Sequence, residues 1–194
     1  MQVSHIGAVD ASEHPDAARN SSYEVVSRLA LKPGRYEVRV ALDGAPSRRA
    51  SVHTYVDVPD FAQQPLSLSG IVLAVSPAVP AAPPDPFTNL LPVVPTARRH
   101  FARTDRATAF VRVYQNAKKV VPPATLTARI VDTSDRLVLN EAKSLTADGF
   151  MGNRGADYRL ELPVDRLESG EYLLTIETAQ GQSTARRGIR FTVR

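Results

Sequence analysis

Histidines are the residues of this chain best suited to acid–base or metal chemistry, and their spacing supports neither. His5 and His14 lie near the start of the sequence, His53 falls in a segment of alternating residues, and His100 follows a pair of arginines. Metal-binding histidines of one segment commonly follow the patterns H-x-H or H-x-x-x-H, and neither occurs here. The chain has no cysteine, which excludes disulfides and thiolate metal sites. We expect surface or structural roles for these histidines and no bound metal.

Paired carboxylates are a second chemistry to consider. Asp148 and Asp157 lie at the two ends of the glycine-containing segment DGFMGNRGAD. A glycosidase needs two carboxylates at a fixed separation, whereas carboxylates in a turn-forming segment usually face solvent. The sequence also contains no G-x-S-x-G, P-loop or G-x-G-x-x-G motif. We therefore predict a protein that is not an enzyme and binds no cofactor.

Positive charge is densest in the segment RRHFARTDR. Arg98, Arg99, Arg103 and Arg106 surround Phe101 there. One interpretation is a basic patch for an anion or an acidic partner, and the other, which we favour, is a solvated loop leading into a strand. The net charge of +4 and the pI of about 9.6 reflect a small excess spread over several segments. We expect no nucleic-acid binding.

The first residues of the chain lack the pattern of an ordered element. Residues 1–22 are small and polar without sustained periodicity, and we interpret them as a flexible leader. They contain no charged region followed by an apolar one, as a signal peptide would. No later apolar run approaches the roughly 20 residues that span a bilayer, so no membrane span is expected.

The elements that must position the remaining residues are β-strands. In residues 23–58, Tyr36, Val38 and Val40 alternate with charged residues, the period of a strand with one buried face. The segment DGAPSRR then supplies turn residues, and SVHTYVDV follows as a second strand. The two strands should form a hairpin, which is only part of a β-sandwich module.

A second module is expected over residues 59–194. The prolines of PDFAQQP mark the boundary, and LSLSGIVLAV should open the module as one strand. In residues 76–95, prolines recur at every third position, the repeat of a polyproline II helix: Pro77, Pro80, Pro83 and Pro86. This segment is either a ligand for an SH3-like groove or a stiff crossover between strands. We favour the crossover, with Phe87, Leu90 and Leu91 anchored on the module surface.

Short alternating segments continue to the end of the chain. The predicted buried faces are Leu126, Ala128 and Ile130 in one strand, Tyr158, Leu160 and Leu162 in another, and Ile189, Phe191 and Val193 in the last. No segment has the period of an amphipathic helix. The fold class is therefore predicted to be all-β, an antiparallel β-sandwich of immunoglobulin-like or fibronectin III-like type.

One motif occurs twice, as LKPGRYEVRV at residues 31–40 and as LESGEYLLTI at residues 167–176. In many sandwiches a tyrosine at the start of a late strand donates its hydroxyl to the backbone upstream, an arrangement called a tyrosine corner. The predicted corner residues are Leu31, Gly34 and Tyr36 in the first copy, and Leu167, Gly170 and Tyr172 in the second. A basic dipeptide follows each copy, at Arg48–Arg49 and Arg186–Arg187. The repeat predicts equivalent corners in two related modules.

Longer phrases between the corners carry a family resemblance. YVDVPDFAQQPLSLSGIVLA, LLPVVPTARRHFARTDRATAFVRVYQ and DYRLELPVDRLESGEYLLTIE resemble the C-terminal, non-catalytic region of bacterial von Willebrand factor A domain-related proteins, best known from Acidobacteria. The resemblance covers about residues 23–194. It implies an exported protein, with an extracytoplasmic location, in which sandwich modules follow an A domain. This chain lacks the A domain itself.

The A domain of that family binds a metal ion through D-x-S-x-S. The nearest segment here is DTSDR, in which Arg136 replaces the second serine. The guanidinium would repel a cation, and the segment has the composition of an ordinary Asp/Ser turn. We expect no metal at Asp132.

The sequence thus favours a non-enzymatic β-sandwich protein that spaces domains or contacts other proteins. The alternatives are a carbohydrate-binding module and an accessory domain of a hydrolase. Sugar-binding faces commonly present exposed aromatic side chains, and this chain has no tryptophan and 6 tyrosines. The partial first module suggests a fragment of a longer protein and, for the isolated chain, self-association through the N-terminal strands.

Overall fold

A computed structural model describes residues 24–44, 48–82, 87–116, 122–150 and 155–194. The predicted leader, residues 1–22, therefore lies outside the described residues, as do Pro83 and Pro86. Within the described part, the regular structure consists of β-strands and one short 3₁₀ turn, η1 (Ala147–Gly149). The prediction of an all-β fold is confirmed.

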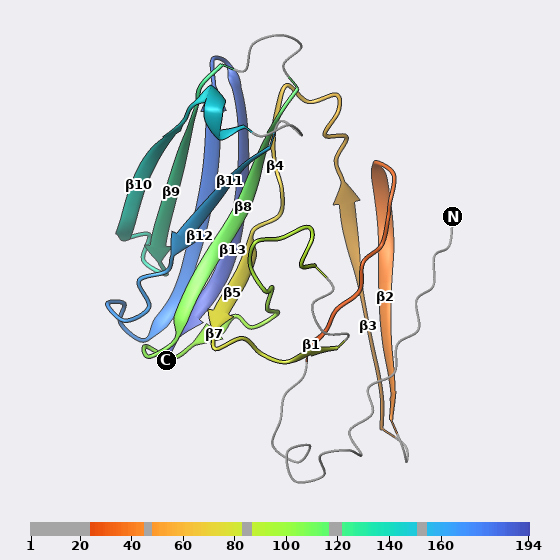
Figure 1. Cartoon of the computed structure of the whole chain (residues 1–194). Coiled ribbons are helices and arrows are strands. Elements are labelled where there is room, and N and C mark those ends of the chain that lie inside the picture. Colours follow the sequence, from red (N-terminus) through yellow and green to blue (C-terminus); the bar gives the residue numbers. More distant parts are fainter. Residues whose placement is uncertain (1–23, 45–47, 83–86, 117–121, 151–154) are drawn as a thin grey trace.

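Most of the strands form a sandwich of two sheets (Figure 1). The strands of the first sheet are, in spatial order, β10 (Leu137–Leu145), β9 (Ala124–Asp132), β12 (Gly170–Gln180), β13 (Ser183–Val193) and β7 (His100–Phe101). In the second sheet, β8 (Arg106–Gln115) lies between β11 (Gly155–Glu161) on one side and β4 (Leu66–Leu68) with β5 (Val72–Ser76) on the other. All of these pairings are antiparallel except that of β7 with β13.

Alternation along each strand selects the face that enters the core. The sequence predicted inward residues in β9 and in β11, including the residue that follows β11. All of them are 0–5% exposed: Leu126, Ala128, Ile130, Tyr158, Leu160 and Leu162. Aromatic rings fill one end of the core, where the Phe191 ring lies 5.6 Å from that of Tyr172 and 6.3 Å from that of Phe101. Burial of these side chains is the main stabilising contribution to the sandwich, because apolar surface is removed from water on both sheets.

A second structural unit, the hairpin of β2 (Gly34–Gly44) and β3 (Arg48–Val58), stands beside the sandwich (Figure 1). The strands pair along their whole length, from Gly34 opposite Val58 to Gly44 opposite Arg48. Hairpin β12–β13 is built in the same way, from Gly170 opposite Val193 to Gln180 opposite Ser183. The two hairpins are thus structural repeats, each with strands of 11 residues.

Both repeats contain the hydrogen bond of a tyrosine corner. The Tyr172 hydroxyl donates to the backbone carbonyl of Glu168 at 2.8 Å, and the Tyr36 hydroxyl donates to that of Lys32 at 2.9 Å. The glycines of the motif differ, because Gly34 has a φ of 149°, which side-chain-bearing residues rarely adopt, whereas Gly170 is not among the glycines with positive φ. Only the first corner therefore requires glycine for its backbone conformation.

Two expectations about the repeat and its surroundings are wrong in detail. LSLSGIVLAV forms two strands, β4 and β5, because the chain leaves the edge of β8 at residues 69–71 and returns to it. The basic dipeptides are not equivalent, since Arg49 pairs with Asp43 near the hairpin turn while Arg187 pairs with Ile176 in mid-strand. Local sequence similarity suggested an alignment that the strand register does not support.

The proline-rich segment runs across the surface between β5 and β7. Its described residues include β6 (Ala81–Ala82), which pairs in parallel with β1 (Glu24–Val25), and a turn in which the Leu90 and Leu91 amides donate to the carbonyl of Phe87. Phe87 and Leu91 are half-buried, whereas Leu90 is exposed. The segment therefore connects the two sheets and also holds the start of the described chain.

Candidate functional site

The DTSDR segment forms a closed turn around its first carboxylate. Asp132 Oδ1 accepts hydrogen bonds from the backbone N–H groups of Ser134 (2.9 Å) and Arg136 (3.0 Å), and Oδ2 accepts one from Arg136 Nε at 2.9 Å. The carboxylate is thus occupied by its own turn and by a guanidinium. Among the described residues, no group of three or more His, Asp or Glu side chains is placed to hold a metal ion.

These contacts lower the pKa of Asp132 from its ordinary value, with the Arg136 hydrogen bond as the largest cause and the two backbone donors as further causes. A folded-state pKa below the unfolded one contributes stability above the unfolded pKa, and this contribution is lost as pH falls through the folded pKa. We expect an NMR titration of the Asp132 carboxyl carbon to give a midpoint below that of an ordinary aspartate. The midpoint should rise in Arg136→Ala without fully returning, because the backbone donors remain. An unchanged midpoint in that variant would contradict the assignment.

The other candidate acid–base residues are not brought together. His53 lies on β3 and His100 on β7, both exposed, while His5 and His14 lie outside the described residues. Asp148 is exposed in the 3₁₀ turn. The pKa of Glu37 on β2 is lowered mainly by its hydrogen bond with Arg39 and to a smaller extent by the charge of the nearby His53, so this carboxylate is part of an exposed cross-strand cluster.

Asp157 corrects the expectation of a solvated turn carboxylate. It lies on β11 directly opposite Arg112 of β8, and its two oxygens accept hydrogen bonds from Arg112 Nε (2.5 Å) and Nη2 (2.9 Å). The carboxylate raises the pKa of Arg112, mainly through these hydrogen bonds. A bidentate pair of this kind fixes both side chains across the strands, so Asp157 is a structural residue of the sheet surface.

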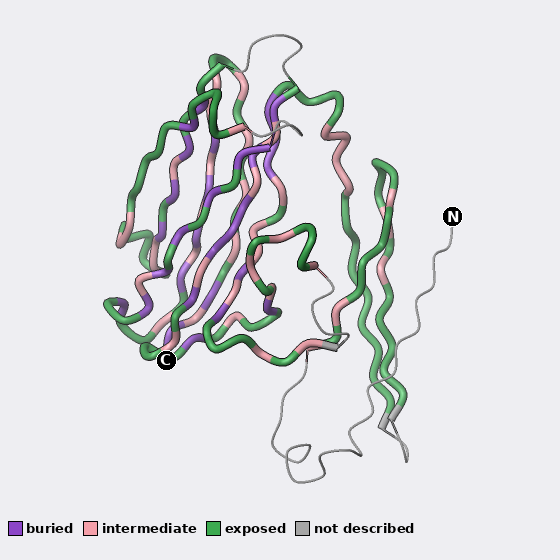
Figure 2. The backbone as a smooth tube through the Cα atoms, viewed as in Figure 1, coloured by how far each residue is buried: buried purple, intermediate pink, exposed green. Residues whose placement is uncertain are grey.

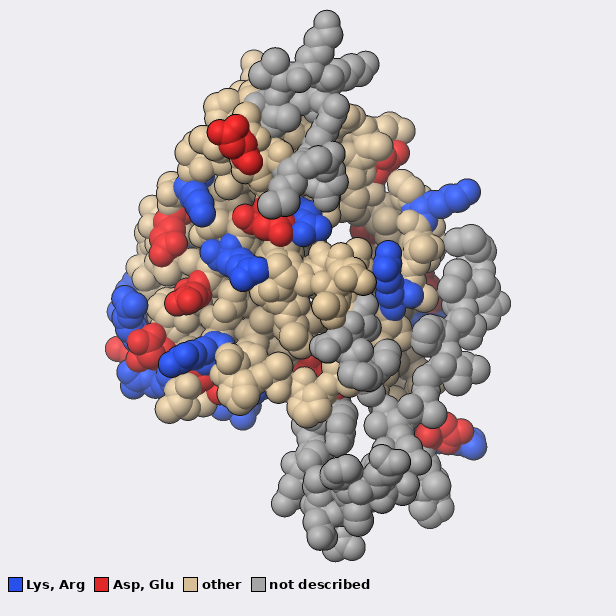
Figure 3. Space-filling model, in the orientation of Figure 1, with Lys and Arg blue, Asp and Glu red and all other residues tan. Residues whose placement is uncertain are grey.

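Three of the four arginines of the predicted basic patch form hydrogen bonds or an ion pair within the protein. Arg98 Nη2 lies 3.0 Å from Asp105 Oδ2, and Arg103 Nη2 donates to the carbonyl of Asp165 at 2.8 Å. Arg99 Nη1 donates to the carbonyls of Thr96 (3.1 Å) and Arg98 (2.8 Å), and desolvation lowers its pKa. Arg106, the first residue of β8, is exposed. Charges of both signs also alternate over the face of the sandwich in Figure 3. The cluster therefore presents less free charge than its sequence suggests.

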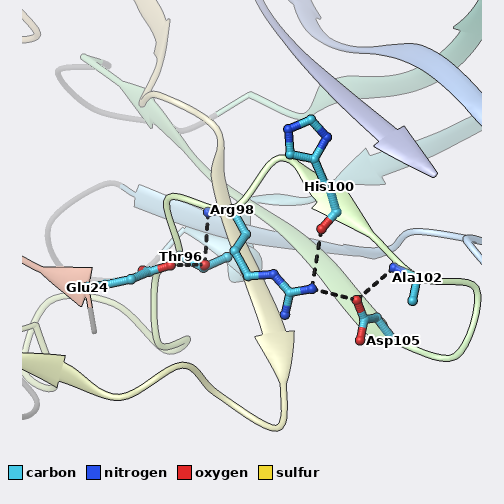
Figure 4. A network of polar contacts seen from close by, with 6 residues as sticks. All are labelled: Glu24, Thr96, Arg98, His100, Ala102 and Asp105. Atoms are coloured by element: carbon cyan, nitrogen blue, oxygen red, sulfur yellow. Dashed lines mark hydrogen bonds and ion pairs between the residues drawn. The ribbon is translucent and has the colours of Figure 1, made fainter. Parts of the chain in front are cut away.

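A partly buried network of hydrogen bonds connects this cluster to the start of the described chain (Figure 4). Glu24 accepts hydrogen bonds from the Thr96 hydroxyl (2.5 Å) and from the backbone N–H of Ala97 (3.0 Å). Thr96 is 7% exposed, and its hydroxyl also accepts a hydrogen bond from the backbone N–H of Arg98 at 3.1 Å. Sequence reasoning missed Glu24 because its partner is 72 positions away and no local pattern indicates it.

The segment that follows β3 is attached to the end of β8. Phe61, three positions after β3, lies with its ring 5.0 Å from that of Tyr114. The Asn116 backbone N–H donates to the carbonyl of Pro65 at 3.1 Å, and the Asn116 side-chain amide donates to that of Ala62. The segments before and after hairpin β2–β3 are thus both held to the sandwich, the first by Glu24 and the second by the contacts of Phe61 and Ala62 with Tyr114 and Asn116. Both segments leave the hairpin at the end where Gly34 lies opposite Val58.

Over most of its length, one side of the hairpin is apolar, and we call it the hairpin face. It consists of Tyr36, Val38, Val40 and Leu42 of β2 and Ala50, Val52, Thr54 and Val56 of β3, which lie opposite one another in the register. Its exposed fractions include 51% for Val40, 60% for Leu42, 65% for Val52 and 41% for Val56. A continuous apolar strip that remains open to water is characteristic of an interaction surface.

The described chain also contains an apolar cavity of about 370 Å³ beside the proline-rich segment. Its walls include Val26, Ala81, Phe87, Leu91 and Val94. Of the described residues that line it, Thr88 is the most polar, and none is titratable. The cavity therefore lacks the groups that acid–base catalysis requires.

The fold and these surfaces define an all-β sandwich protein with an exposed, attached hairpin. Comparison with protein-family models and with curated protein sequences gave no match. Within the described part of the chain, no helix has the length and apolarity needed to cross a membrane.

Proposed function

We propose that the chain is a non-enzymatic structural and protein-interaction module of an exported or surface-associated bacterial protein. The hairpin face is the observation that carries the proposal, because it is an apolar strip of paired strands with side chains up to 65% exposed. Its attachment at Glu24 and at Phe61 supports a role in presenting this strip at a defined position beside the sandwich. The two sheets serve as the scaffold.

The family-level part of the proposal rests on further observations. The strand order, with a tyrosine corner at the start of β12 and a short strand parallel to β13, supports an immunoglobulin-like or fibronectin III-like type. The resemblance to von Willebrand factor A domain-related proteins supports the extracytoplasmic location. Both observations are compatible with a role that involves no catalytic group.

Carbohydrate binding is less well supported by the exposed side chains. Tyr55 is the one strongly exposed aromatic residue of the described chain, at 58%. The guanidinium of Arg35 lies 4.9 Å from the centroid of its ring and occupies one of the two faces that could stack on a sugar. A flat sugar-binding face usually combines several free aromatic rings, which the described surface does not offer.

The absence of cysteine allows a direct test, because a single introduced cysteine can carry a fluorophore at one chosen position. We would place an environment-sensitive dye at Val52→Cys on the hairpin face and, as the matched control, at Ser51→Cys on the opposite side. Nanomolar labelled chain would then be mixed with a bacterial envelope protein fraction or with a glycan library. We expect a blue shift with the protein fraction at position 52 and none at position 51. A response only to glycans, or to neither mixture, would contradict the proposal.

A further inference from the structure

The internal repeat reveals what the hairpin face lacks. In β12, the positions equivalent to Tyr36, Val38 and Val40 are Tyr172, Leu174 and Ile176, whose exposed fractions are 5%, 0% and 0%. Figure 2 shows buried residues along β12 and at the C-terminal end of β13, whereas β2 and β3 are mostly exposed. The second sheet of the sandwich covers β12 and β13, and the described chain places no equivalent sheet on the hairpin face.

Between Arg35 and Asp43 of β2, and between Arg49 and Asp57 of β3, the charged residues lie on the other side of the hairpin. There Arg35 lies opposite Asp57, and Arg49 Nε donates to Asp43 Oδ1 at 3.2 Å. Glu37 accepts a hydrogen bond from Arg39 Nε at 2.7 Å on the same side. The hairpin face itself carries no ionisable group except the Tyr36 hydroxyl, which is engaged in the corner. Its partner must therefore offer a long strip without charges, because an unpaired charge placed on this face would lose its hydration.

We propose that the partner is a second copy of this chain, with the two hairpin faces stacked on each other about a two-fold axis. This inference rests on the proposed interaction function and names its partner. A second copy offers a strip of the same length, width and apolar character, and a two-fold arrangement lets one surface serve on both molecules. The result is a small sandwich of two hairpins that repeats, between chains, the layer arrangement already present around β12 and β13.

The size of the hairpin face determines how strong this association is. Strands of 11 residues are about 37 Å long, and a pair of strands is roughly 10 Å wide, which gives a footprint of about 370 Å² on each copy. The two copies together would cover about 740 Å², whereas stable interfaces bury about 1,200–2,000 Å² in total and smaller ones are characteristic of weak, transient complexes. We therefore expect a concentration-dependent dimer with a dissociation constant in the micromolar range or weaker.

Sedimentation equilibrium of the full chain tests the proposal. From about 1 to several hundred micromolar, the average mass should rise from that of one chain, 21.1 kDa, towards twice that value. Val52→Lys places a charge in the interface and should keep the chain monomeric throughout. Ser51→Lys, on the opposite side of β3, should dimerise as the wild type does. A monomeric wild type at the highest concentration, or equal disruption by both lysines, would overturn the proposal.

Cross-linking provides a readout that does not depend on a destabilising charge. Val40 and Val52 pair with each other near the middle of the hairpin, so they lie close to the two-fold axis. Under mild oxidation at high concentration, Val52→Cys should form disulfide-linked dimers several-fold faster than Ser51→Cys, and equal rates would overturn the proposal. The chain labelled at position 52 distinguishes the proposed interaction function from self-association. If the dye at position 52 shifts with envelope protein but not with excess unlabelled chain, the interaction function stands and self-association is wrong.

Discussion

Replacement of Ile176 by alanine is expected to lower the free energy of unfolding by about 2–5 kcal/mol, because it removes buried methyl groups and leaves a cavity. Val40→Ala, at the equivalent position of β2, should change it by less than about 0.5 kcal/mol. Ile176 is 0% exposed and Val40 is 51% exposed, although both follow the same corner by the same number of residues. The difference between the two changes in unfolding free energy therefore reports whether a second sheet covers the apolar side of each hairpin, and not a difference in local sequence.

Chemical denaturation followed by circular dichroism is the appropriate measurement, because the chain has no tryptophan to report on the core. It should be made at submicromolar concentration, where the expected dimer is dissociated. A cost for Val40→Ala similar to that for Ile176→Ala would contradict the exposed hairpin face. A rise in the Val40→Ala cost at high concentration alone would agree with self-association.

Removal of the Tyr172 hydroxyl is expected to cost about 1–3 kcal/mol, because Tyr172→Phe removes a part-buried hydrogen bond to the backbone carbonyl of Glu168. Tyr36→Phe breaks the same kind of bond at Lys32, but this bond is exposed and water can replace the donor. Its cost should be below about 0.5 kcal/mol. Phe retains the ring contact of Tyr172 with Phe191, so the comparison isolates the hydroxyl.

The same denaturation experiment measures both tyrosine variants. Since the two corner bonds have lengths of 2.8 Å and 2.9 Å, hydrogen-bond geometry alone predicts equal costs. An unchanged midpoint for Tyr172→Phe would show that the corner does not stabilise the sandwich. Equal large costs for the two variants would indicate that a further layer covers Tyr36 in solution.

The two pairs of variants also test the proposed interaction function, because both compare a covered hairpin with an exposed one. Hairpin β2–β3, with both of its flanking segments attached and one apolar side open, resembles the late strands of a sandwich in strand length, pairing and corner hydrogen bond. Association of two copies would bury that side without any rearrangement of the sandwich. The proposed interaction and the stability of the hairpin are therefore expected to be linked, since the surface proposed to bind a partner is also the apolar surface that is left exposed to water.

The sequence by itself determined the strands and the corners. Alternation with period two is a local property, and it correctly identified the inward residues Leu126 and Ile130 of β9. The spacing of leucine, glycine and tyrosine is also local, and the tyrosine at each repeat makes the same hydrogen bond. Turn chemistry likewise accounts for Asp132, whose partners lie within four positions.

Only the tertiary structure decided which surfaces are covered and which charges are paired. Glu24 meets Thr96 across 72 positions, and Asp157 meets Arg112 because two strands lie side by side in one register. Ile176 and Val40 occupy the same position of the repeated motif, four residues after the corner tyrosine, yet one is buried and the other is exposed. The physical reason is that burial and ion pairing depend on what lies across the sheet or on the facing layer, and residues distant in sequence supply those contacts.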